Sequence, residues 1–179
     1  MRHETALVIL DVQLGMFDKN DPVYNGSELL FKISNLLVKA RAEGIPVVFI
    51  QHCGDADHIL HMDKPGWPIH SSIAPEKDEL VILKRNYDSF QNTCLQEKLG
   101  YLNIKHLVMT GIQTEFCFDT TCRRAYSLGY RVTVVKDGHS TWDTEDLKAI
   151  QIIDHYNRLL HGRFATVKAA NEIEFEELS

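Results

Sequence analysis

The chain has 179 residues, of which 44% are hydrophobic and 25% are charged, and its formal net charge is -6. This composition is typical of a globular protein, so we expect one domain over residues 1–179 and neither a disordered nor a fibrous chain. The longest apolar runs, at residues 6–10 and 45–50, are too short for a membrane-spanning helix, which needs about 18 residues. The negative charge disfavours nucleic acid as a partner.

The first residues lead directly into an apolar run and lack the pattern of a secretory signal, which favours a cytoplasmic protein. The four cysteines, at positions 53, 94, 117 and 122, contain no Cys-x-x-Cys pair. Because disulfides are rare in a reducing compartment, we expect all four to be free thiols.

Short apolar segments alternate with amphipathic ones along the chain. Strands are predicted at residues 6–10, 46–50, 80–83, 106–109, 132–135 and 164–167. Helices are predicted at about 27–43, 93–99, 116–128 and 149–160, followed closely by Gly44, Gly100, Gly129 and Gly162. This alternation predicts an α/β fold with three layers, in which helices cover both faces of a six-stranded, mostly parallel sheet. The polar stretch 51–79 has no periodicity and is predicted to be a long functional loop.

In an open parallel sheet, ligands bind beyond the carboxyl ends of the strands. Asp11 and Lys84 each follow a predicted strand directly, and Cys117 stands at the start of the helix after residues 106–109. A helix N-terminus and a nearby ammonium both favour a thiolate, so we expect the pKa of Cys117 to lie below about 8.5. A carboxylate beside the thiol can accept its proton and return it to a leaving amine, as amide cleavage requires.

Three segments, residues 7–13, 83–90 and 111–122, carry a resemblance to a known family. In order and spacing they resemble the signature segments of the isochorismatase-like cysteine hydrolases, and the likeness spans residues 5 to about 168. That family includes nicotinamidases, N-carbamoylsarcosine amidase and the ureidoacrylate and streptothricin hydrolases.

The resemblance implies a Rossmann-like sheet and assigns roles to residues. Cys117 would be the nucleophile, Asp11 the proton-transfer group and Lys84 the cation that balances them. It further implies a cis peptide between Ile112 and Gln113, with the backbone N–H groups of Gln113 and Cys117 forming the oxyanion hole.

The implied reaction is cleavage of an amide, ureido or lactam C–N bond of a small molecule through a thioester. We expect the substrate to contact residues near the strand ends, although packing is the alternative role of the aromatic ones: Gln13, Phe17, Trp67, Tyr87 and Phe118. The resemblance also implies a homo-oligomer, and no cofactor is expected.

Four other interpretations remain open at this point. Cys117 could pair with His139 in a papain-like arrangement, although residues 137–141 resemble a turn and a helix cap. Nicotinamidases carry a metal near the 51–79 segment, which here contains His52, Asp55, Asp57, His58, His61 and Asp63. Their Asp-x-His pattern is missing, so no metal is expected. Related isochorismatases cleave a vinyl ether but generally lack the cysteine, and a catalytically silent binding module is the fourth possibility.

Overall fold

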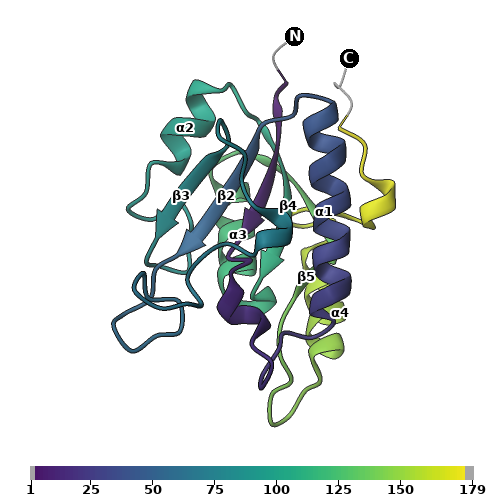
Figure 1. The fold of residues 1–179 in the computed structure, drawn as a ribbon. Helices are drawn as coiled ribbons and strands as arrows, with labels where there is room; N and C mark the ends of the chain where they lie inside the picture. The colour runs from purple at the N-terminus through teal and green to yellow at the C-terminus, as the bar shows by residue number, and fades with distance from the viewer. Residues whose placement is uncertain (1–2, 176–179) are drawn as a thin grey trace.

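The protein is described here by a computed structural model that covers residues 3–175 (Figure 1). Six strands form one sheet: β1 (Thr5–Leu10), β2 (Val47–His52), β3 (Leu80–Lys84), β4 (His106–Ile112), β5 (Arg131–Ser140) and β6 (Thr166–Lys168). Four α-helices connect them: α1 (Gly26–Ala42), α2 (Leu95–Tyr101), α3 (Asp119–Ser127) and α4 (Ala149–Leu160). Four short helical turns complete the described elements: η1 (Leu14–Phe17), η2 (Ser71–Ile73), η3 (Thr114–Phe118) and η4 (Ala170–Glu172).

The strand order is β3-β2-β1-β4-β5-β6, and every neighbouring pair is parallel. This confirms the predicted α/β class and six-stranded sheet. The chain starts at β1 in the middle of the sheet and adds β2 and β3 on one side, then β4, β5 and β6 on the other. The direction of winding therefore reverses between β1 and β4. Ligand sites of doubly wound sheets lie beyond the carboxyl ends of the strands at such a point.

Side chains of β1 alternate between two hydrophobic cores, one on each face of the sheet. Leu7 and Ile9 pack with the buried face of α1, whereas Val8 and Leu10 pack with residues of α2, α3 and α4. Figure 1 shows α1 in front of the sheet and α3 behind it. All six residues of β1 are buried, because helices cover both faces of this central strand.

Several element boundaries differ from the prediction. β2 extends to His52 and β5 extends to Ser140, so the predicted turn at 137–141 lies largely within a strand. The ladder between β4 and β5 shifts register after Met109 and resumes at the pair Gly111 and His139, which accommodates the polar residues 136–138. The predicted helix 116–128 consists of the π-helical η3 followed by α3.

The predicted helix stop at Gly100 is wrong. α2 continues through Gly100 to Tyr101, and the residue with positive φ after it is Asn103, at 58°. Gly44, Gly129 and Gly162 do have positive φ, as expected of residues that end helices. Over residues 3–175, none of the helices has the length and apolarity that a membrane crossing requires.

Candidate active site

Three side chains from separate strand ends meet at the middle of the sheet. Asp11 follows β1, Lys84 is the last residue of β3, and Cys117 lies in η3 after β4. The Nζ atom of Lys84 is 2.7 Å from Oδ2 of Asp11 and 3.0 Å from Sγ of Cys117. All three residues are buried, with exposed fractions of 1%, 2% and 8% for Asp11, Lys84 and Cys117. The strand-end argument therefore identified a set of residues that the fold brings into contact.

The backbone around Asp11 and Gly111 is tightly constrained. Asp11 has a φ of 53°, in the left-handed region, and its N–H donates to the carbonyl of Ile50 at 2.9 Å. Gly111, at φ 137°, passes so close to β1 that a Cβ atom there would lie 2.2 Å from the carbonyl oxygen of Leu10. Only glycine fits this position. The following peptide bond, between Ile112 and Gln113, is cis.

The π-helical turn that carries Cys117 is fixed by a buried chain of hydrogen bonds between side chains. Thr114 Oγ1 lies 2.9 Å from Nδ1 of His139, and Nε2 of His139 lies 3.1 Å from Oδ1 of Asn157. Both ring nitrogens of His139 are thus engaged away from the thiol. Burial lowers the pKa of His139 to about 4, so the ring is neutral. This geometry does not support a papain-like pair between His139 and Cys117.

The electrostatics correct the expectation of a resting thiolate. Burial first, and then the Asp11 carboxylate, raise the pKa of Cys117 to about 12, although Lys84 acts in the opposite direction. Burial alone would lower the pKa of Lys84, but Asp11 and Cys117 together raise it above its ordinary value. One ammonium can balance one anion, and a second anion beside it is unfavourable. The raised pKa therefore favours the protonated thiol in the resting site, beside the Lys84 ammonium and the Asp11 carboxylate.

Two of the predicted substrate contacts are buried structural residues. Gln13 has an exposed fraction of 0%, and its side-chain amide bonds to both backbone groups of His52 and to the carbonyl of Trp67. Phe118 is also fully buried, with its ring stacked on His139 at 4.5 Å between centroids. Phe118 points into the core because it follows Cys117 directly in the helical turn. Both side chains are fully buried and held by contacts within the protein, which does not support their assignment to the substrate wall.

The other three predicted contacts are not fully buried. Phe17 packs edge-on against His70, with 4.8 Å between ring centroids. Trp67 is partly buried, and its Nε1 atom is buried without a partner among the described residues. Tyr87 is 59% exposed and stacks on Phe116 at 5.6 Å. Phe116 precedes Cys117 in the sequence, is 44% exposed and was not among the predicted contacts.

The residues of the 51–79 segment do not assemble a metal site. Among residues 3–175, the one cluster of possible ligands is formed by Asp11, His52 and Cys117, whose donor atoms lie within 4.8 Å of one another. The Nζ atom of Lys84 lies 2.7 Å from Asp11, 3.0 Å from Cys117 and 3.4 Å from Nδ1 of His52. The ammonium therefore occupies the position that a cation would need, and these residues do not fit a metal ion.

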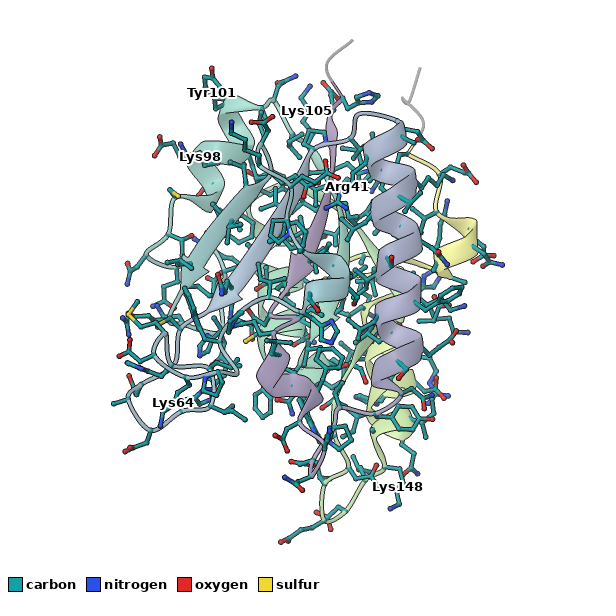
Figure 2. The ribbon with its side chains drawn as sticks, in the orientation of Figure 1. Arg41, Lys64, Lys98, Tyr101, Lys105 and Lys148 are labelled. Atoms are coloured by element: carbon teal, nitrogen blue, oxygen red, sulfur yellow. The ribbon has the colours of Figure 1, made fainter. Side chains whose placement is uncertain are left out.

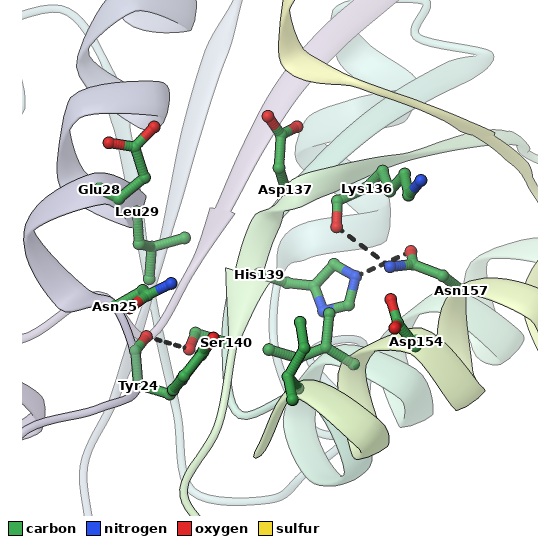
Figure 3. Close-up of a pocket in the computed structure, with 12 residues that line it drawn as sticks. Tyr24, Asn25, Glu28, Leu29, Lys136, Asp137, His139, Ser140, Asp154 and Asn157 are labelled. Atoms are coloured by element: carbon green, nitrogen blue, oxygen red, sulfur yellow. Dashed lines mark hydrogen bonds between the residues drawn. The ribbon is translucent and has the colours of Figure 1, made fainter. Parts of the chain in front are cut away.

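At least three cavities lie apart from the three strand-end residues. One, of about 190 Å³, lies between α1, β5 and α4, where His139 bonds to Asn157 (Figure 3). Another, of about 610 Å³, is lined by residues that include Arg41, Lys98 and Tyr101. Figure 2 places Tyr101 and Lys98 at the end of the molecule opposite Lys64, which belongs to the segment beyond β2. None of these cavities includes Asp11, Lys84 or Cys117, so the candidate site remains at the strand ends.

A parallel α/β sheet with reactive side chains at its strand ends is an architecture of small-molecule enzymes. The chain belongs to the isochorismatase domain family, which matches residues 5–167. An uncharacterized member from Bacillus subtilis is 33% identical over 171 residues, which cover 92% of this chain and 95% of that protein. A crystal structure of an isochorismatase from Pseudomonas putida superimposes with a TM-score of 0.90 at 28% identity, covering 96% of this chain and 90% of that chain.

Two relatives are named for a hydrolytic activity. A streptothricin hydrolase of Streptomyces noursei is 30% identical over 169 residues, which cover 94% of this chain and 60% of that protein. A ureidoacrylate amidohydrolase of Variovorax paradoxus is 25% identical over 170 residues, which cover 75% of this chain and 68% of that protein. The family thus contains hydrolases, and amide hydrolases are among the relatives of this chain.

Proposed function

We propose that this protein is a cysteine-dependent hydrolase that cleaves the C–N bond of a small amide, ureido compound or lactam. The observation that carries the proposal is the position of Lys84 Nζ, 2.7 Å from the Asp11 carboxylate and 3.0 Å from the Cys117 thiol. A nucleophile, a proton acceptor and a fixed cation are the groups that acyl transfer from nitrogen requires.

In the first half-reaction, Sγ of Cys117 attacks the carbonyl carbon of the substrate and its proton moves to Asp11. The N–H groups of Gln113 and Cys117 stabilise the oxyanion that develops on the carbonyl oxygen. Asp11 then donates the proton to the substrate nitrogen, the C–N bond breaks, and ammonia or an amine leaves. The product of this half-reaction is a thioester on Cys117.

In the second half-reaction, water attacks the thioester carbonyl while Asp11 accepts a proton from that water. The C–S bond breaks, the acid is released, and the proton returns from Asp11 to the sulfur. Throughout both halves, Lys84 faces one negative charge, first on the carboxylate and then on the sulfur or the oxyanion. The raised pKa of Cys117 fits this cycle, because the thiol loses its proton only when Asp11 accepts it.

The cysteine supports the amide class over the alternatives. A vinyl ether hydrolase has no need of a nucleophilic thiol, whereas a thioester intermediate requires one. A silent binding module would have no reason to hold an ammonium and a carboxylate against a buried thiol, since isolating these charges from water is costly. The two hydrolase relatives support the same choice.

The test is a panel of small amides that includes nicotinamide, ureido compounds, N-carbamoyl amino acids and streptothricin-type lactams, with Cys117→Ser as the blank. We expect at least one amide to be hydrolysed by the wild-type chain, with turnover abolished by Cys117→Ser and by Cys117→Ala. Mass spectrometry of the rapidly acidified reaction should show an acyl adduct on the peptide that contains Cys117. Hydrolysis that persists in both variants would overturn the assignment of the nucleophile.

The acyl adduct, rather than the rate of labelling, separates the silent module from the enzyme. A catalytic thiol at the base of a binding site should react with amide-like electrophiles in a way that depends on Asp11 and Lys84. A silent module would show the same dependence, because Asp11 and Lys84 act on the pKa of the thiol, but none of the amides would leave an acyl adduct on Cys117.

A further inference from the structure

His52 lies in the candidate site, yet the mechanism above gives it no task. It is the last residue of β2, the strand between β1 and β3, and its register partner in the sheet is Lys84. Its Nδ1 is 3.4 Å from Nζ of Lys84. A ring nitrogen of His52 also lies within 4.8 Å of both the Asp11 carboxylate and the Cys117 sulfur.

The backbone of His52 is clamped on both sides by one side chain. The N–H of His52 donates to Oε1 of Gln13 at 2.8 Å, and its carbonyl accepts from Nε2 of Gln13 at 3.0 Å. The ring packs edge-on against His58, with 5.6 Å between centroids, and Nδ1 of His58 accepts the N–H of Leu60 at 3.1 Å. The imidazole of His52 is therefore oriented by contacts that do not involve a ligand, as a preorganised binding group should be.

The neighbours of His52 determine which ring nitrogen carries the proton. The Lys84 ammonium has only hydrogens to offer, so Nδ1 of His52 faces it as an acceptor and the proton resides on Nε2. Burial and Lys84 lower the pKa of His52, with His58 adding to the effect and Asp11 and Asp55 opposing it. The ring is thus neutral near pH 7. Among residues 3–175, no group bonds to Nε2 of His52, and the side chain is only partly buried.

We propose that His52 is a substrate-binding residue whose Nε2–H donates a hydrogen bond to an oxygen atom of the substrate beside the scissile carbonyl. A carbonyl carbon in position for attack lies about 3–3.5 Å from the sulfur. One ring nitrogen of His52 lies within 4.8 Å of that sulfur, so an oxygen one or two bonds beyond the carbonyl carbon is within reach of the imidazole. Because the imidazole offers a neutral donor, the matching group is a second carbonyl or a carboxylate. The substrate class is an amide or ureido compound with such an acceptor next to the bond that is cleaved.

This proposal depends on the proposed hydrolase function, so its test uses two independent measurements on the full chain. The variants are His52→Asn, which keeps a polar atom near the position of Nδ1 but loses the donor at Nε2, and His52→Gln, whose amide N–H reaches the position of Nε2. His155→Asn, at an exposed position on α4, is the control. Thermal unfolding of each variant monitors the fold.

The first measurement is kcat/KM for the amide that the panel identifies. We expect a decrease of at least 30-fold in His52→Asn and of no more than about threefold in His52→Gln, with His155→Asn unchanged. Equal activity of His52→Asn and the wild type would overturn the proposal. An equal, large loss in both His52 variants, with unchanged kinetics in the control, would also overturn it. The loss of activity would then not result from the missing donor at Nε2.

The second measurement needs no turnover. Iodoacetamide carries a carbonyl oxygen next to the carbon that sulfur attacks, whereas iodoethane carries no hydrogen-bond acceptor there. The ratio of the two rates of Cys117 alkylation should fall about fivefold in His52→Asn and stay near the wild-type ratio in His52→Gln and His155→Asn. An unchanged ratio in His52→Asn would contradict the proposal. If no amide is hydrolysed by the wild type but this ratio changes as expected, the hydrolase proposal fails while the binding role of His52 stands.

Discussion

Gln13 and Trp67 are 54 residues apart in the sequence and are joined by a hydrogen bond of 2.6 Å from Nε2 of Gln13 to the carbonyl of Trp67. Gln51 donates to the same carbonyl at 3.0 Å. Two amide side chains at the ends of β1 and β2 thus fasten the long segment after β2 across the strand ends. Since Gln13 also binds both backbone groups of His52, one buried amide fixes the loop and the end of β2 together.

Replacement of Gln13 by alanine should loosen this segment. The change removes the partner of the N–H and of the carbonyl of His52, whereas the Trp67 carbonyl keeps its bond from Gln51. Each unsatisfied group costs about 1–3 kcal/mol. We expect the free energy of unfolding, measured by urea denaturation, to fall by about 2–3 kcal/mol. Proteolytic cleavage within residues 53–79 should become faster. Gln91→Ala, at an exposed position, is the control and should behave like the wild type.

Replacement of Asp11 by asparagine should separate thiol reactivity from catalysis. Because the Asp11 carboxylate helps to raise the pKa of Cys117, its removal lowers that pKa. Alkylation of Cys117 by iodoacetamide at pH 7–8 should therefore become at least about tenfold faster, while amide hydrolysis falls by more than about 100-fold, since no proton acceptor remains. Exposed Cys94 serves as an internal standard in the same peptide digest. Slower alkylation of Cys117 in this variant would contradict the effect of Asp11 on the thiol pKa.

Replacement of Lys84 by methionine should have the opposite effect on the thiol. Lys84 lowers the pKa of Cys117, so its loss raises that pKa and shifts alkylation to higher pH. We also expect a loss of about 3–5 kcal/mol in stability, because the buried Asp11 carboxylate loses its cation. The double variant Asp11→Asn/Lys84→Met should recover part of this loss. If the double variant loses more stability than the sum of the losses in the two single variants, the broken ion pair does not explain the effect of Lys84→Met.

Replacement of Gly111 by alanine should be far more damaging than the same change at Gly44. Both glycines have positive φ, but a Cβ atom at Gly44 meets nothing within 4 Å, whereas one at Gly111 meets the backbone of Leu10. We expect Gly44→Ala to cost about 1–2 kcal/mol from backbone strain alone. Gly111→Ala should cost more than about 4 kcal/mol or prevent folding, since β1 and β4 would have to separate. Similar melting temperatures for the two variants would show that β1 and β4 do not pack this closely.

His139 should make the protein sensitive to acid. Its pKa is about 4 in the folded chain and about 6.5 in the unfolded chain, so the unfolded chain binds more protons between these values. Stability is therefore full above about pH 6.5 and decreases as the pH falls toward about 4. In His139→Gln this contribution is absent, so the stability difference between wild type and variant should shrink by about 2–3 kcal/mol between pH 7 and pH 4.5. Urea denaturation at both pH values measures it, and a constant difference would refute the assignment.

The fold could be predicted because its main signals are local. Buried parallel strands are continuous apolar segments, and the helices between them show a clear apolar face and, at three of four ends, a glycine with positive φ. The meeting of Asp11, Lys84 and Cys117 follows from the parallel topology, since all strands of such a sheet end on the same side.

What could not be predicted depends on distant partners. Residues 137–141 resemble a turn, but residues 137–140 extend β5, because Gly111 and Ile112 of β4 pair with His139 and Ser140. The neutral state of His139 depends on its burial within the folded chain. His52 was considered only as a metal ligand, because the strand before it was predicted to end two residues early. With β2 at its full length, the strand-end rule would have included His52 in the site.

The ion pair between Lys84 and Asp11 has a mechanical consequence. β3 lies at the edge of the sheet, and β2 separates it from β1. Edge strands open more readily than central ones. Any opening of β3 withdraws the Lys84 ammonium and leaves the Asp11 carboxylate and the Cys117 thiol buried without a cation. The free energy of opening β3 therefore includes the cost of breaking this ion pair. The edge strand is thereby anchored through Asp11, and a molecule in which β3 has begun to fray has already lost the arrangement that the proposed reaction requires.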